Sequence, residues 1–253
     1  MAGRPDEKNL ESRREYLGKY EKSHVGKWVR DSLSKIIANR PEDPIQFLAS
    51  YFESIREKGN RVVRAHQVLY LTHHSRLAFE DNVATAYQIL STPSSSKHSF
   101  GLTGSAYKEL LRKILRFVPE TVEDDIMRKI GPRDHEFIPL DVFHHGILTA
   151  FVLIDFLQQS EGLYNCLDSH SNGQVPHILC EAVLHELKES VTSTSTEPIS
   201  ILQAGARLNE SQILHCLEEA ETEAKSNLSG SMSSDEFIRH ATDIFLEKVR
   251  PIR

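Results

Sequence analysis

The chain has few cysteines, no long uninterrupted apolar run and no large excess of one charge. Its 253 residues carry a formal net charge of −6 and include three cysteines, Cys166, Cys180 and Cys216, whose isolated positions do not indicate a disulfide framework. The longest apolar segment, ILTAFVLIDFL (147–157), is about half the ~20 residues that a helix needs to span a bilayer, so we expect no membrane protein. The N-terminal residues lack the apolar core of a signal peptide, and we expect the chain to stay in the cytoplasm.

Motifs of catalysis and metal binding are also missing. The segment GLTGSAYK (101–108) has neither the spacing of a phosphate-binding loop nor a strand before it. The histidine pairs 73–74 and 144–145 come without CxxC or HExxH, and adjacent histidines on a helix point about 100° apart. We therefore predict no catalytic residue, no metal site and no cofactor; the histidines should form hydrogen bonds at helix boundaries and the cysteines should pack in the core.

Charge is divided unevenly between the two halves of the chain. Residues 1–116 contain 20 Lys and Arg against 13 Asp and Glu, a balance of +7, whereas residues 117–253 contain 10 against 23, a balance of −13. This asymmetry suggests two surfaces for different partners, although solvated helix faces can also drift in composition. Basic and acidic residues alternate within each half, which predicts no nucleic-acid binding.

Apolar residues recur at three- and four-residue spacing along almost the whole chain, which predicts an all-α fold. Helices are expected over 25–39, 44–57, 61–91 (one helix, or two with a break near 74–75), 107–118, 121–130, from 140 onward, and near 175–189, 209–224 and 234–249. Ser- and Thr-rich breaks at 92–104, 190–196 and 226–234 should be surface loops. No segment shows a competing strand pattern.

The turn NRPED (39–43) separates the first two helices. Pro41 restricts the backbone of Arg40 and should end the first helix. Asp43 followed by Pro44 provides an N-cap and a proline at the first helical position, which predicts a helix start.

Two segments, IPLDVF (138–143) and MSSDEF (232–237), each place an apolar residue five positions before a Phe that opens a helix, which resembles the exit half of an EF-hand. If Ile138 takes the central apolar position, Gly131 and Val142 stand where oxygen ligands belong, so we expect no calcium. We interpret the repeat as helix capping, with Ser233 and Glu236 forming a capping box.

The second helix carries a wide apolar face. Ile45, Leu48, Phe52 and Ile55 form one stripe, and Phe47 and Tyr51 widen it. A helical hairpin buries only one face of each helix, so this width predicts a further partner; the alternative is packing onto later helices of the same chain. The predicted docking residues are Val25, Trp28, Val29, Leu33, Ile36, Ile45, Leu48 and Phe52.

The stretch from about residue 16 to 57, with its turn RPEDPIQFL, resembles the RII-alpha-type dimerisation/docking domain of protein kinase A regulatory subunits. In that family two such hairpins pair into a four-helix bundle. The resemblance implies an N-terminal hairpin that forms a homodimer or a heterodimer, followed by a larger helical domain. We place a disordered N-terminus at 1–20, the docking hairpin at 21–58 and a helical scaffold domain at 61–253.

The remainder, including LTHHSRLAFEDNVATAYQILS, RDHEFIPLDVFHHGILTAFVLIDFL and DEFIRHATDIFLEKVRPI, resembles the family of tubulin polyglutamylase complex subunit 1. That family implies a non-catalytic scaffold and targeting subunit, which assembles with a tubulin-tyrosine-ligase-like glutamylase and other subunits that together add glutamate chains to tubulin tails. It also implies indirect contact with microtubules and a location in the cytoskeleton, at the axoneme and basal body of cilia and flagella, and in the centrosomal region.

Two other functions remain open from the sequence. The hairpin alone is compatible with a dimeric docking module that binds amphipathic helices of kinase-anchoring or radial-spoke proteins. An enzyme with an unfamiliar helical site that uses the histidines would require turnover by the isolated chain.

Overall fold

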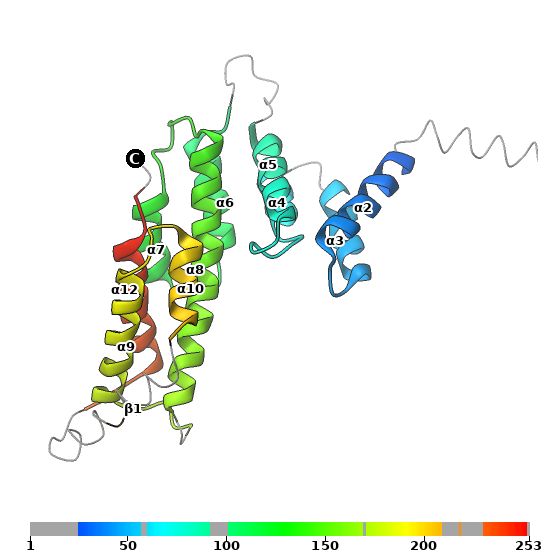
Figure 1. Cartoon of the computed structure of the whole chain (residues 1–253). Coiled ribbons are helices and arrows are strands. Elements are labelled where there is room, and N and C mark those ends of the chain that lie inside the picture. The colour runs from blue at the N-terminus through cyan, green and yellow to red at the C-terminus, as the bar shows by residue number, and fades with distance from the viewer. Residues whose placement is uncertain are drawn as a thin grey trace, which may run out of the picture. The chain divides into compact units, whose positions relative to one another are not determined.

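The computed structural model describes residues 25–56, 60–91, 101–168, 171–208, 218 and 230–251 (Figure 1). Its elements are α2 (Val25–Asn39), α3 (Pro44–Arg56), α4 (Arg61–Leu69), α5 (Ala78–Ser91), α6 (Gly104–Ile114), α7 (Glu120–Ile130), α8 (Leu140–Leu167), β1 (Val175–Pro176), α9 (His177–Thr192), α10 (Pro198–Ala206), β2 (Ser231–Met232) and α12 (Ser234–Lys248). The all-α prediction is confirmed. The predictions for residues 1–20, the helix near 209–224, Cys216 and most of the loop at 92–104 lie largely or wholly outside the described residues.

The chain divides into two compact units, Met1–Asn82 and Val83–Arg253. The hairpin boundary that we placed near residue 58 stays a prediction. The helical region expected over 61–91 is two helices, and the interruption from Tyr70 to Leu77 contains the break expected near 74–75. The Asn60 side chain starts α4 by accepting hydrogen bonds from Val62 N and Val63 N at 2.9 and 3.1 Å.

The long helix α8 is the centre of the second unit. It packs against α6, α9, α10 and α12. By length and composition alone α8 could cross a membrane, although the 11-residue apolar run in its sequence did not suggest this. Half of the most apolar part of α8 is buried inside the protein. Since these helices cover it, we interpret α8 as the core helix of this unit.

Aromatic side chains fix α8 to its neighbours. Phe143 packs against Tyr87 of α5 and Tyr107 of α6, with ring centroids 5.4 and 5.5 Å apart. Farther along, Phe156 packs against Phe245 of α12 at 5.1 Å. The 28-residue helix α8 thus packs in two successive parts of the same core.

Two features of the second unit were not predicted. The helix α10 lies between the break expected at 190–196 and the helix expected near 209–224, where we predicted no helix, although Pro198 at its first position is a start signal that could have revealed it. The strands β1 and β2 form a two-stranded antiparallel pair in which Val175 faces Met232. Such short pairing between residues far apart in the sequence leaves no periodic pattern to read.

Candidate interaction surface

The α2–α3 hairpin is held together by its turn and by the contacts of the Tyr51 hydroxyl with α2. Asp43 Oδ1 accepts hydrogen bonds from Ile45 N and Gln46 N, both at 2.9 Å, so the predicted N-cap is confirmed. Arg40 adopts a φ of 44°, which ends α2 directly before Pro41. From the segment after α4, the Arg76 guanidinium donates to the carbonyl oxygens of Asn39 and Arg40 at 2.7 and 2.9 Å.

Tyr51 connects α3 to α2. Its hydroxyl donates to a carboxylate oxygen of Asp31, and the carbonyl oxygen of Trp28 lies 3.4 Å away. Burial raises the pKa of Tyr51 above its ordinary value, and the hydrogen bond to the Asp31 carboxylate raises it further. Tyr51 therefore stays protonated and keeps donating across the hairpin at neutral pH.

One face of the hairpin packs within its own chain. Phe47, Tyr51 and Leu71 form a small buried cluster, with Ile36 and Ile55 partly buried against it. We expected Phe47 and Tyr51 to widen the stripe that predicts a further partner, with packing on later helices of the chain as the alternative, and for these two residues the structure shows the alternative. Part of the apolar width of α3 is thus explained by intrachain packing.

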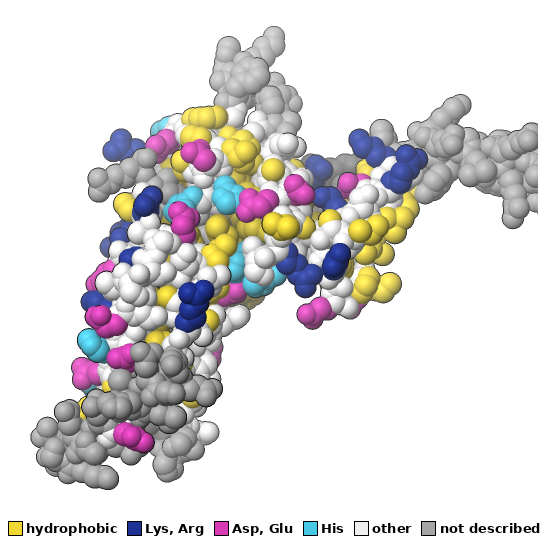
Figure 2. All heavy atoms as spheres, in the orientation of Figure 1, with side chains coloured by type: hydrophobic (Ala, Val, Ile, Leu, Met, Phe, Trp, Pro, Cys, Tyr) yellow, Lys and Arg dark blue, Asp and Glu magenta, His cyan; other side chains and the backbone are white. Residues whose placement is uncertain are grey.

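The opposite face of the hairpin is exposed. Figure 2 shows hydrophobic side chains gathered on one side of α2 and α3, with Lys and Arg side chains near them. The exposed fraction is 76% for Ile45, 74% for Ile37 and 53% for Leu33. Of the eight predicted docking residues, Val25, Leu33, Ile45 and Phe52 are exposed, and Trp28, Val29, Ile36 and Leu48 are half-buried. A contiguous apolar surface of this kind is typical of an interaction site.

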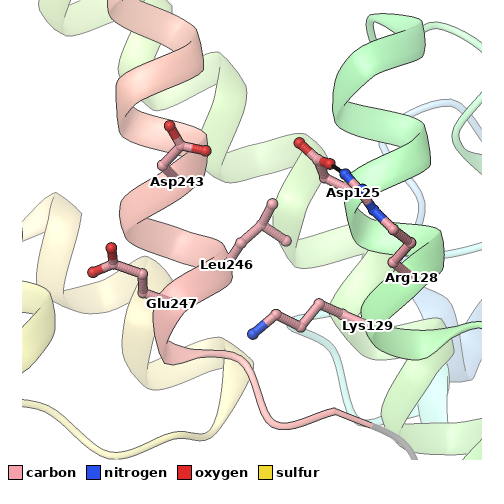
Figure 3. A pocket seen from close by; sticks show the side chains of 6 residues that line it. All are labelled: Asp125, Arg128, Lys129, Asp243, Leu246 and Glu247. Atoms are coloured by element: carbon pink, nitrogen blue, oxygen red, sulfur yellow. Dashed lines mark ion pairs between the residues drawn. The ribbon is translucent and has the colours of Figure 1, made fainter.

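A second surface region lies between α7 and α12. Asp125, Arg128 and Lys129 of α7 and Asp243, Leu246 and Glu247 of α12 line an open groove of about 470 Å³ (Figure 3). Arg128 pairs with Asp125 on the same helix. The groove carries both signs of charge, which gives it no preference for a ligand of one charge.

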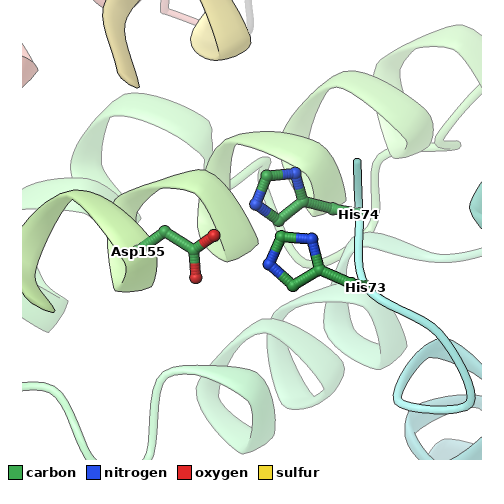
Figure 4. Close-up of side chains that lie close together, drawn as sticks. All are labelled: His73, His74 and Asp155. Atoms are coloured by element: carbon green, nitrogen blue, oxygen red, sulfur yellow. The ribbon is translucent and has the colours of Figure 1, made fainter. Parts of the chain in front are cut away.

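The histidine pair at 73–74 differs from our expectation in its geometry. These residues lie in the turn after α4 and not on a helix, so the 100° separation does not apply, and their rings lie 4.3 Å apart (Figure 4). His73 Nδ1 lies 2.8 Å from the Ser75 hydroxyl, a local hydrogen bond within the turn. Asp155, also drawn in Figure 4, belongs to α8 in the second unit.

The cysteines do not share one environment. Cys180 is fully buried, and burial raises its pKa to about 11, so its thiol stays protonated and weakly nucleophilic. Cys166 is exposed, so our expectation that it packs in the core is wrong.

Fold and surface together define an all-helical protein with an exposed apolar hairpin face. The family model described as "Tubulin polyglutamylase complex subunit 1-like, C-terminal" matches residues 56–250. A human protein named tubulin polyglutamylase complex subunit 1 is 36% identical over 249 residues, which cover 90% of this chain and 85% of the human protein. The chain belongs to the tubulin polyglutamylase complex subunit 1 family. No solved structure matches it.

Proposed function

We propose that this chain is a non-catalytic scaffold and targeting subunit of a tubulin polyglutamylase complex, and that it docks through the exposed apolar face of the α2–α3 hairpin. The observation that carries the docking role is the row of exposed aliphatic side chains on a hairpin whose other face already packs on its own chain. Because water contact with these side chains is unfavourable, a partner that covers them gains binding free energy.

The partners that this role requires are a tubulin-tyrosine-ligase-like glutamylase and the other subunits of the complex. The name of the human relative supports membership of such a complex. The likeness also extends over residues 56–250, beyond the hairpin, which favours a complex subunit over a stand-alone docking module. The expected locations are the cytoskeleton, the axoneme and basal body of cilia and flagella, and the centrosomal region.

Charge argues for an indirect contact with tubulin. Residues 117–253 carry 23 Asp and Glu against 10 Lys and Arg. Tubulin tails are acidic, so this half repels them, and we assign tail capture to other subunits.

The test compares two aspartate substitutions at exposed apolar positions. Ile45→Asp introduces a charge on the hairpin face, and Phe117→Asp introduces one at a position in the second unit that is 82% exposed. Because both side chains are exposed within the chain, both variants should fold like the wild type, as thermal unfolding can check. Each full-length tagged variant is then purified from ciliated cells.

We expect the wild type and Phe117→Asp each to recover a tubulin glutamylase in an amount nearly equal to that of the tagged chain. Ile45→Asp should lose most of the bound glutamylase. Recovery of kinase-anchoring or spoke proteins without glutamylase would support the stand-alone module. Normal assembly of Ile45→Asp would show that the hairpin face is not the docking surface.

A further inference from the structure

The four helices α6, α8, α9 and α12 begin in the same way. An apolar residue with at most 1% exposure stands two positions before each helix: Leu102, Ile138, Val175 and Met232. The sequence showed this feature at Ile138 and Met232 only. The structure adds the other two and shows that the four residues form two pairs.

Within each pair, backbone hydrogen bonds connect the two segments that lead into the helices. Ile138 N donates to Leu102 O at 3.0 Å, next to an antiparallel bridge between Thr103 and Phe137. In the other pair Val175 faces Met232 in the β1–β2 ladder. Antiparallel pairing of two loops, each followed at once by a helix, is the arrangement of paired EF-hands.

The loop lengths agree with this assignment. The nine residues 131–139 separate α7 from α8, and the nine residues 168–176 separate α8 from α9. Counted as EF-hand loops of 12 residues, which include the first turn of the next helix, they place Ile138 and Val175 both at position 8. The helix α8 leaves one loop and enters the next, and so joins the two pairs.

The described residues of the third loop (168–179) share one backbone feature with an EF-hand. Gly173 stands at position 6 with a φ of 72°, in the left-handed region that the sharp turn of an EF-hand needs. Asp168 stands at position 1, and its two carboxylate oxygens accept hydrogen bonds from Asn172 N at 3.1 Å and Gly173 N at 2.8 Å. The carboxylate thereby ties position 1 of the loop to positions 5 and 6 without an ion.

No loop, however, combines the two acidic residues that calcium binding needs. High affinity needs an acidic residue at position 1 and a bidentate glutamate at position 12. Positions 1 and 12 are held by Ser95 and Ala106, Gly131 and Val142, Asp168 and Leu179, and Lys225 and Glu236. In the third loop the single side-chain oxygen of Asn172 accepts from Gln174 N at 2.9 Å, so it already has a partner.

The helices of the second pair already carry a further packed helix, α10. In α10 Ile201 is fully buried, and the helix packs on α8 and α9. A Cβ on Gly205 would lie 3.5 Å from side-chain atoms of Phe156 and Leu187, which shows how closely α10 approaches them. The Ser190 hydroxyl of α9 donates to Ala204 O at 2.8 Å. At nine residues α10 is too short to be stable by itself, so this packing holds it.

We propose that the described parts of residues 101–251 form two EF-hand-type lobes joined by α8, that they keep their shape without calcium because Asp168 closes the third loop in place of the ion, and that the second lobe binds an apolar helix, its own α10. Calcium sensors open such lobes only when the ion binds. This chain therefore presents one fixed shape at any calcium concentration, and its assembly with partners is independent of calcium.

The first test measures thermal unfolding and calcium binding of the full chain in chelator and in millimolar calcium. We expect the same Tm in both and no saturable heat of binding. Asp168→Ala should lower the Tm by several degrees and speed hydrogen exchange at the Asn172 and Gly173 amides, and calcium should not reverse either change. The matched control is Asp124→Ala, at an exposed position on α7.

A rise of the wild-type Tm with calcium, or saturable binding, would overturn the proposal in favour of a real calcium site. If Asp168→Ala behaves like Asp124→Ala, the carboxylate does not close the loop. Neither outcome affects the docking role of the hairpin, which the Ile45→Asp experiment tests separately.

The second test uses two isoleucines of α10. Ile201 is fully buried, whereas Ile199 is 36% exposed. Ile201→Asp should release α10 and increase the fluorescence of a dye that binds apolar surfaces, measured well below the unfolding transition, while Ile199→Asp should leave it near the wild-type level. Equal fluorescence from both variants would show that α10 is not a bound helix.

Discussion

The α2–α3 hairpin and the α8-centred unit are both built from helices, but they differ in where they place large apolar side chains. Ile37 and Ile45 of the hairpin are about three-quarters exposed, whereas Phe143, Ile147 and Leu153 of α8 are fully buried. The hairpin has one small cluster around Phe47, and α8 has helices packed along its length. An exposed apolar face and a saturated core therefore occur in one chain, and only the first is available to a partner.

The largest effect that separates the two regions should come from truncating their apolar side chains. Phe143→Ala removes a buried ring that packs against Tyr87 and Tyr107, and we expect a loss of about 3–5 kcal/mol in the free energy of unfolding. Ile45→Ala should change it by less than about 0.5 kcal/mol in dilute solution. Urea unfolding monitored by circular dichroism measures both, and equal losses would remove the distinction.

Two glycines sharpen the description of the second unit. A Cβ on Gly104 would clash with the carbonyl oxygen of Arg133, so Gly104→Ala should cost about 1–3 kcal/mol because the paired loops must shift. Gly162 lies on α8 with nothing near its Cβ position, and Gly162→Ala should stabilise the protein by about 0.5–1 kcal/mol. The Tm values of the two variants should thus shift in opposite directions. If Gly104→Ala raised the Tm as Gly162→Ala should, the loops would not be tightly paired.

The hairpin should lose stability in alkali through Tyr51. Its folded-state pKa is raised by burial and by Asp31, so the unfolded tyrosine ionises first, from about pH 10, and stability falls as the pH rises above that value. Tyr51→Phe removes the hydrogen bond, costs about 1 kcal/mol at neutral pH and reduces this alkaline loss. Unfolding of the hairpin, followed by Trp28 fluorescence from pH 8 to 11, tests this; an identical pH profile of the variant would contradict it.

The smallest effect is expected at the surface ion pair of Lys108 and Asp134. The Lys108 ammonium lies 2.8 Å from the carboxylate of Asp134 and lowers the pKa of this carboxylate. The pair therefore stabilises the folded protein at pH values above the ordinary aspartate pKa, and this contribution is lost as the pH falls through the lowered pKa. Because the carboxylate is exposed, Asp134→Asn should lower the Tm only slightly, and molar salt should remove the difference. A large, salt-independent decrease would show that the pair supports the loop more strongly.

Local signals in the sequence predicted most helices correctly. Asp43 and Pro44 predicted the start of α3, and Gly131 followed by Pro132 predicted the end of α7. Ser233 caps α12 by accepting from Glu236 N at 3.4 Å, as expected for one half of the capping box. These features are readable because a cap and its partner stand within a few residues of each other.

The candidate surface could be predicted only in part. The apolar residues of α2 and α3 were identified from their spacing, but the division between an inner face with Phe47 and Tyr51 and an outer face with Ile45 was not. That division depends on Leu71, which reaches the hairpin from beyond the next helix. Sequence periodicity shows how wide an apolar face is, and it does not show which part of the face the rest of the chain will cover.

The sequence by itself determined most of the helices, several of their caps and the family, because helical periodicity, capping residues and long colinear similarity are all recorded locally along the chain. Only the tertiary structure decided that Val175 pairs with Met232, that α10 lies on α8 and α9, and that one side of the hairpin stays exposed. These outcomes depend on contacts between segments far apart in the sequence, where shape and backbone hydrogen bonding select the partner and no local pattern records the choice.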